Sequence, residues 1–181
     1  MANQKKCGQY LWLDMEMTGL EPQIHKILEV AIIITDEHFN VLHSFETPVF
    51  QPPEVLERMD EWCIKTHGES GLTAKIPSAP PITEIEVNIC AQLKQHFHSK
   101  DKIILAGNSI GQDRKFIDAY MPLLSNMLHY RMVDVSSFKE VFQRQYNLQF
   151  EKQNKHRALE DIKESIAELQ YYLSFVKQEK S

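Results

Sequence analysis

Residues 10–17 read YLWLDMEM, an apolar run that carries two acidic residues near its end. A short run of this kind predicts a β-strand. Residues 27–36 and 41–50 predict two more strands, and residues 36–40 predict a short hairpin connection between them. Three strands in succession favour an antiparallel start to a sheet.

The second half of the chain changes to helical spacing. Thr83 and Glu86 predict a capping box at the start of a helix, ahead of apolar residues at helical intervals. Four more elements are predicted beyond it: a strand at 103–106, a helix at 113–121, a strand at 132–135 and a helix at 136–146. Ser136 or Ser137 is the expected cap of that helix. The final helix is the longest, with these apolar positions: Leu159, Ile162, Ile166, Leu169, Leu173 and Val176.

The order β-β-β-α-β-α-β-α predicts an α/β fold, in which helices flank a mixed sheet of five strands. At 181 residues, with 43% hydrophobic residues, 6 Gly and 8 Pro, the composition is that of an ordinary globular protein. We expect a single domain at residues 10–177 after an N-terminal extension at residues 1–9. Residues 68–81 form a Gly- and Pro-containing stretch long enough to be a functional loop.

The three cysteines are odd in number, far apart and without CxxC spacing, which predicts reduced thiols and neither a disulfide framework nor a thiolate zinc site. Residues 1–9 have no apolar core of a signal peptide, and no run approaches the ~18 apolar residues of a membrane span. These observations predict a soluble, cytoplasmic protein.

Asp14 and Glu16 are separated by one residue in a predicted strand, so their side chains leave the same face. Taken alone, this spacing is weak, and a charge pair on an edge strand is the more common explanation. The two acids end an apolar run, however, where unpaired carboxylates are costly unless cations neutralise them. The pair therefore predicts half of a metal site.

Two later acids are candidate partners. Asp113 follows a predicted buried strand at the start of a helix, where negative charge is favourable, so an ordinary N-terminal helix acid is the alternative. Asp161 lies on the inward side of the last helix, where a solvated acid is not expected. His156 precedes Asp161 by five residues, which in an unbroken helix turns the two side chains roughly 140° apart. We therefore expect His156 in the loop or cap before the helix.

These residues occur in longer stretches with a family resemblance: DMEMTGL (14–20), MDEWCIKTHGESGL (59–72), GNSIGQDRKF (107–116), HYRMVDVSS (129–137) and NKHRALEDIKES (154–165). The order D-x-E, a later Asp and H-x4-D resembles the DEDDh exonucleases of the DnaQ-like superfamily. More narrowly, the stretches are similar to the oligoribonuclease family from Tyr10 to about Phe175. The resemblance implies a ribonuclease H-like fold.

The resemblance also implies a chemistry. The four carboxylates of Asp14, Glu16, Asp113 and Asp161 are hard ligands that suit two divalent cations, Mg²⁺ or Mn²⁺. His156 is implied as the general base, because an imidazole with a pKa of roughly 6.5 accepts a proton near neutral pH. The expected reaction is two-metal hydrolysis of RNA from the 3′ end, which releases nucleoside 5′-monophosphates.

Charge limits the substrate. The chain carries a net charge of −5, which is unusual for a protein that holds a long polyanion through many phosphate contacts. Two bound divalent cations on four acids bring the charge to only about −1. No Lys- or Arg-rich run is present to follow an extended backbone, so we expect a short nucleic acid. The family resemblance implies RNA of two to five nucleotides, dinucleotides especially.

Further residues resemble the substrate contacts of the family. Leu20 resembles a wedge between terminal bases, and Trp62 and His67 fall in a helical segment and the following turn expected near the 3′ end. From the sequence alone, a leucine such as Leu20 is more often simply buried, and Trp62 is as readily a core aromatic.

Ser109, Arg131, Ser136 and Tyr130 resemble phosphate and base contacts, and the family implies a homodimer in which Tyr130 reaches the partner's site. Without the resemblance, Arg131 is as readily a surface arginine. Asp134 is expected to play a structural part.

Two alternatives remain open. A proofreading or DNA-trimming exonuclease of the same superfamily shares every metal ligand. A catalytically silent nucleic-acid-binding or dimerisation module of the same fold is a different class of protein, but it has no need of all five catalytic side chains.

Overall fold

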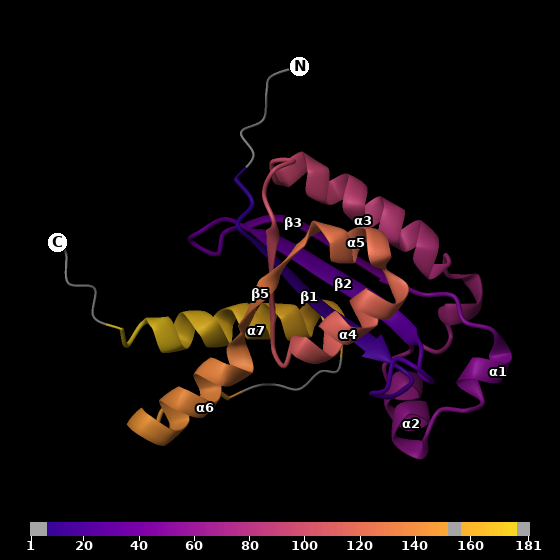
Figure 1. Ribbon diagram of the computed structural model, residues 1–181. Coiled ribbons are helices and arrows are strands. Elements are labelled where there is room, and N and C mark those ends of the chain that lie inside the picture. Colours follow the sequence, from indigo (N-terminus) through magenta and orange to yellow (C-terminus); the bar gives the residue numbers. More distant parts are fainter. Residues whose placement is uncertain (1–6, 152–156, 177–181) are drawn as a thin grey trace.

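The computed structural model describes residues 7–151 and 157–176 (Figure 1). Five strands form one sheet in the order β3-β2-β1-β4-β5. Their bounds are β1 Tyr10–Met17, β2 Ile27–Thr35, β3 Val41–Pro48, β4 Ile103–Gly107 and β5 Leu128–Asp134. The first three strands pair antiparallel, whereas β4 pairs in parallel with both β1 and β5. The predicted mixed, five-stranded α/β sheet is confirmed.

Helices cover both faces of the sheet (Figure 1). Their bounds are α1 Pro53–Leu56, α2 Glu61–Glu69, the 3₁₀ helix η1 Ile76–Ser78, α3 Ile82–His96, α4 Gly111–Tyr120, α5 Pro122–Met127, α6 Val135–Tyr146 and α7 Ala158–Leu173. Among the described residues, no helix combines the length and apolar character needed to cross a membrane. Cys7, Cys63 and Cys90 are free thiols, as predicted.

Side-chain alternation along β1 decides which residues meet which helices. Leu11, Leu13 and Met15 point into a core shared with α3, α4 and α5. Trp12 points to the other face, into a core shared with α6 and α7. Alternation puts Asp14 and Glu16 on this same second face, where the strand reaches the start of α7.

Two capping predictions are wrong, the first because a tertiary contact replaces a local pattern and the second because a neighbouring residue is the cap. Helix α3 begins after Pro81, and the buried Glu86 carboxylate accepts the N–H groups of Leu123 and Leu124 at 2.6 and 3.1 Å. Glu86 therefore satisfies the first turn of α5, a helix that was not predicted. Helix α6 begins one residue earlier than expected, because Asp134 and not a serine is its N-cap.

Other differences are smaller. The last helix ends at Leu173, and Leu173 and Val176 are exposed, so the apolar stripe does not reach as far as predicted. Helix α1 was not predicted either, and His67 lies inside α2 and not in the turn after it. Residues 68–81, the expected loop, contain the short 3₁₀ helix.

Candidate metal centre and substrate site

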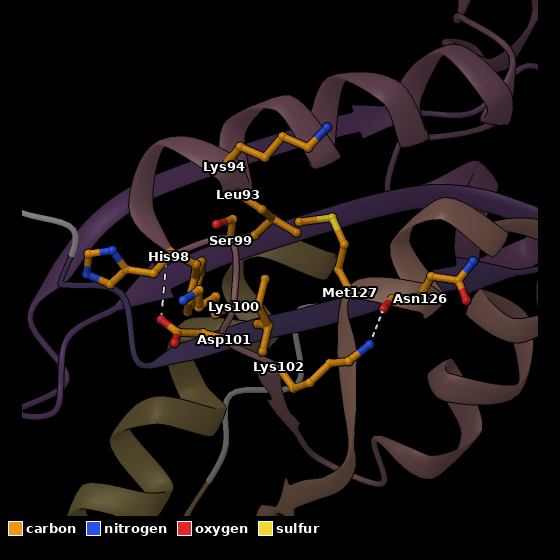
Figure 2. Close-up of a pocket in the computed structure, with 11 residues that line it drawn as sticks. Leu93, Lys94, His98, Ser99, Lys100, Asp101, Lys102, Asn126 and Met127 are labelled. Carbon is orange, nitrogen blue, oxygen red and sulfur yellow. Dashed lines mark hydrogen bonds between the residues drawn. The ribbon is translucent and has the colours of Figure 1, made fainter.

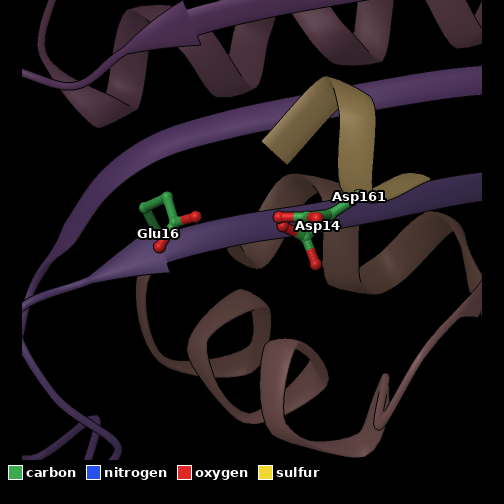
Figure 3. A group of neighbouring side chains, drawn as sticks. All are labelled: Asp14, Glu16 and Asp161. Carbon is green, nitrogen blue, oxygen red and sulfur yellow. The ribbon is translucent and has the colours of Figure 1, made fainter. Parts of the chain in front are cut away.

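Three carboxylates gather at the end of β1. One oxygen each from Asp14, Glu16 and Asp161 lies within 4.8 Å of the other two. Figure 3 shows Asp161 reaching from the first turn of α7 to Asp14, with Glu16 farther along the same strand. The sequence placed these acids on one strand face and one helix, and the fold brings them together across more than 140 residues of chain.

Negative charge on this acidic cluster is energetically unfavourable. The pKa of Glu16 rises from 4.5 to about 7, mainly because the side chain is buried and also because Asp161 and Glu29 lie nearby. Burial and mutual repulsion both favour the protonated form. A divalent cation removes both costs, so a set of oxygen ligands with this environment fits Mg²⁺ or Mn²⁺.

Asp113 lies beside this cluster but is not one of the three gathered acids. It is buried in the first turn of α4, and its Oδ1 accepts the Met15 N–H at 3.1 Å, between the two acids of β1. Its pKa rises from 3.8 to about 7, mainly through burial, while the Met15 hydrogen bond opposes the rise and Glu16 adds to it. Asp113 thus ties α4 to the acidic stretch of β1.

His156 lies outside the described residues. Its neighbour Arg157 is the N-cap of α7, and its guanidinium lies 3.6 Å from Glu29 on β2 and 3.3 Å from Glu46 on β3. These ion pairs fix the start of α7 on the sheet, and therefore the turn that carries Asp161. Sequence reasoning missed Arg157, Glu29 and Glu46, because an ion pair between distant residues leaves no local pattern.

A cavity of about 370 Å³ opens next to the acids, lined by Met15, Glu16, Met17, Gly19, Leu20, Asp60, Trp62 and Cys63. Leu20 is 70% exposed and Trp62 is 58% exposed, so the alternative that these two are core residues is wrong. The two side chains offer apolar surface on the walls of a cavity that ends at Glu16 of the acidic cluster.

His67 links this cavity to the acidic cluster. It is buried, its Nε2 lies 3.2 Å from the Met17 carbonyl, and its Nδ1 lies 3.9 Å from Glu16 Oε2. Its ring also meets Trp62 edge-on, with 6.4 Å between ring centres. His67 therefore supports both the exposed tryptophan and a cluster carboxylate.

The turn that presents Leu20 is held from α4, by contacts that the sequence did not reveal. The Gln112 side-chain amide donates to the Leu20 carbonyl, and the Tyr120 hydroxyl lies 2.6 Å from the Pro22 carbonyl. Gly19 has a φ of 156°, and a Cβ there meets the His25 ring at 2.4 Å. Only glycine fits this position, so the turn has a defined shape.

The remaining candidates lie on β5 or just beyond the ends of β4 and β5. Ser109 and Ser136 contact each other, with 3.1 Å between their hydroxyl oxygens. Tyr130 and Arg131 lie on β5, an edge strand, and Tyr130 is 75% exposed. Arg131 Nε donates to the Tyr130 hydroxyl at 3.0 Å.

A second cavity, of about 280 Å³, lies where α3 ends and β4 begins, with Lys94, Lys100 and Lys102 among its lining residues (Figure 2). None of the acids described above lines it. Because the acidic cluster meets the cavity beside Leu20 and Trp62, we take that cavity as the substrate site.

Known proteins share this architecture and sequence. The RNase_T family model, described as an exonuclease, matches residues 11–169. An oligoribonuclease of Francisella tularensis subsp. tularensis is 45% identical over 166 residues, which cover 90% of this chain and 92% of that protein. An oligoribonuclease of Vibrio cholerae serotype O1 is 44% identical over 168 residues, with the same two coverages.

Solved structures show the shared fold. Exonuclease I of E. coli in complex with a dT13 oligonucleotide superposes with a TM-score of 0.66 at 14% identity, over 93% of this chain and 41% of that one. A zinc-bound form of its complex with single-stranded DNA gives 0.63 at 14% identity, over 88% and 39%. This chain thus spans about two fifths of exonuclease I, with which it shares a ribonuclease H-like fold. We conclude that the chain is a metal-dependent 3′→5′ exonuclease that belongs to the RNase_T exonucleases and, among them, to the oligoribonuclease family.

Proposed function

We propose that the protein hydrolyses RNA of two to five nucleotides, dinucleotides especially, from the 3′ end and releases nucleoside 5′-monophosphates. The observation that carries this proposal is the cluster of Asp14, Glu16 and Asp161 at one end of a cavity lined by Leu20 and Trp62. The acidic cluster is therefore adjacent to apolar side chains against which bases can pack. The oligoribonuclease relatives, at 44–45% identity, support the RNA substrate.

The proposed cofactor is a pair of divalent cations, Mg²⁺ or Mn²⁺, held by the three clustered carboxylates together with Asp113. The ligand set fits, because it consists of hard oxygen donors whose burial disfavours the charge they carry in the absence of a cation. When bound, such cations activate a water molecule and stabilise charge on the leaving oxygen. Asp14 and Glu16 on the rigid β1 fix the ligand positions, and Arg157 fixes Asp161.

His156 is the proposed general base, which accepts a proton from the attacking water. Support comes from the sequence and from the position of its neighbour, since Arg157 is anchored beside the acidic cluster by Glu29 and Glu46. A histidine suits this role because its unperturbed pKa of roughly 6.5 lies close to neutral pH.

Substrate length is set, in this proposal, by contacts at both ends of a short strand. Leu20 and Trp62 bind the 3′ nucleotide, with the buried His67 supporting Trp62, while Ser109, Ser136 and Arg131 bind phosphate toward the 5′ end. An arginine fits this position because its guanidinium binds phosphate through two parallel hydrogen bonds. The net charge of −5 further disfavours long polyanions.

We also propose a homodimer in which Tyr130 reaches the partner's site. The support is an exposed edge strand, β5, on which Tyr130 is 75% and Met132 37% exposed. Unpaired edges with large exposed side chains are common protein-binding surfaces. Light scattering, with Tyr130→Ala as a variant, tests the dimer directly. A single exonuclease domain at residues 10–177 and a cytoplasmic location stay predictions of the sequence.

A length series tests the proposed function. Purified protein with Mg²⁺ is incubated with RNA and DNA oligomers of two to twenty nucleotides, and nucleoside 5′-monophosphate is measured. We expect the highest kcat/KM for RNA dinucleotides and a decline with length. A flat profile, or a preference for long DNA, supports the proofreading or DNA-trimming alternative, and absence of any product supports a silent binding module.

A further inference from the structure

Ser109 and Ser136 form a small polar surface at the ends of β4 and β5. Ser109 has a φ of 49°, a left-handed conformation that is uncommon for a residue with a side chain. Its N–H is donated to Asp134 Oδ1 at 3.0 Å and to Ser136 Oγ at 2.9 Å. Strained backbone of this kind persists only where its surroundings hold it.

A chain of polar groups, half-buried at Asn108 and buried at Ser165 and Glu168, lies directly behind this serine pair. The Ser136 hydroxyl donates to Asn108 Oδ1 at 3.2 Å. The Asn108 amide donates to Ser165 Oγ at 2.8 Å and to Glu168 Oε2 at 3.1 Å. Glu168 is fully buried on α7, where its other oxygen accepts the Tyr172 hydroxyl at 3.1 Å.

Two acceptors on α7 set the direction of the hydrogen bonds in this chain. Glu168 Oε2 and Ser165 Oγ both accept from the Asn108 NH₂, so the Asn108 oxygen faces Ser136. The single hydroxyl proton of Ser136 is then used on Asn108, and its lone pairs face Ser109. The Ser109 hydroxyl is then the donor in its contact with Ser136, with 3.1 Å between the two oxygens.

We propose that Asn108 and Glu168 are positioning residues that orient the Ser109 hydroxyl as a donor to a 5′-phosphate oxygen of the substrate. This inference rests on the proposed function, and it specifies how the 5′ end is recognised. A phosphate oxygen carries no proton and only accepts, so a surface with a fixed donor selects it. Neither positioning residue touches the substrate, since both act through Ser136.

A buried carboxylate is poorly explained by stability alone. Replacing a buried charged group by an apolar one of similar size is often neutral or stabilising, because the charge no longer has to be desolvated. Glu168→Leu should therefore impair recognition of the 5′-phosphate without lowering the stability of the protein. Glu168→Gln is the matched control, because its carbonyl oxygen can accept from Asn108 while the Tyr172 hydroxyl turns to accept from its amide.

The experiment measures kcat and KM for one RNA dinucleotide with and without a 5′-phosphate. For Asn108→Ala and Glu168→Leu we expect KM for the phosphorylated substrate to rise about tenfold, the order expected for loss of a hydrogen bond to a charged group. We expect kcat, the Mn²⁺ affinity by calorimetry and KM for the unphosphorylated dinucleotide to change less than about twofold. Glu168→Gln should keep the preference of the unaltered protein.

Ser109→Ala shows which conclusion fails if the result differs. We expect it to remove the 5′-phosphate preference, and Asn108→Ala to add nothing in the double variant, since both act on one contact. If Ser109→Ala removes the preference but Glu168→Leu and Asn108→Ala keep it, the positioning role is overturned and the proposed function stands. If Ser109→Ala leaves the preference intact, the proposed serine contact is overturned together with the inference.

Discussion

Substituting Glu16 by glutamine should stabilise the metal-free protein while it destroys the metal site. The Glu16 side chain is only 15% exposed, and its pKa rises from 4.5 to about 7. Since one pKa unit corresponds to 1.36 kcal/mol, ionising Glu16 in the folded chain costs about 3 kcal/mol more than in the unfolded chain.

The sign of this effect depends on pH. Because the folded pKa is the higher one, Glu16 costs nothing at pH values below 4.5, where it is protonated in both states. Stability is lost as pH rises from 4.5 to about 7, and the full cost is present above that range. Glu16→Gln removes the charge, so the gain of roughly 3 kcal/mol should appear at pH 8 and fade toward pH 4.5.

Thermal unfolding in EDTA, followed by circular dichroism at pH 4.5 and pH 8, measures this gain. For a chain of this size we expect the Tm of Glu16→Gln to exceed that of the unaltered protein by roughly 6–12 °C at pH 8. Glu37→Gln, at a side chain that is 73% exposed, serves as the control and should change Tm little. An equal gain at both pH values, or none at pH 8, would refute the argument that a buried, repelled carboxylate strains the metal-free site.

Four other changes test the rest of the site. Asp14→Ala should abolish activity by loss of metal, and isothermal titration that shows unchanged Mn²⁺ stoichiometry contradicts its assignment. His156→Ala should keep metal and substrate binding but lose most turnover, on the order of the 10²–10⁴-fold typical of a general base; a matching loss of affinity in binding assays argues against that role. Arg131→Ala should weaken dinucleotide cleavage more than cleavage of longer oligomers, and an equal effect across a length series excludes a part in measuring length. Trp62→Ala should raise KM by roughly tenfold with little change in Tm, because the side chain is 58% exposed and loses a stacking contact rather than core packing; a large fall in Tm shows instead that Trp62 is structural.

Much of the fold was predictable because strand patterns are local. The bounds of β1 agree with the prediction, and β2 and β3 differ only at their ends, since long apolar runs show where strands lie. The mixed character of the sheet followed from the alternation of strands and helices. The capping box of α3 was not predictable, because Glu86 is used by α5, a helix some 37 residues away along the chain.

The clustered acids of the candidate site were predictable, because acidic residues at a defined spacing indicate a metal site. Asp14 and Glu16 share a strand face, and Asp161 lies on the inward turn of the last helix. The groups that hold these residues in place were not predictable, since Arg157 and Tyr120 act through partners distant in sequence. Pairwise contacts of this kind appear only once the chain is folded.

The division of the acidic cluster between the first strand and the last helix has a consequence for synthesis. Asp14 and Glu16 are translated early, but Asp161 follows only after more than 140 further residues. A nascent chain that ends before α7 therefore lacks one of the three clustered carboxylates. We expect a product truncated before α7 to be unable to complete the acidic cluster, whatever the state of its amino-terminal half.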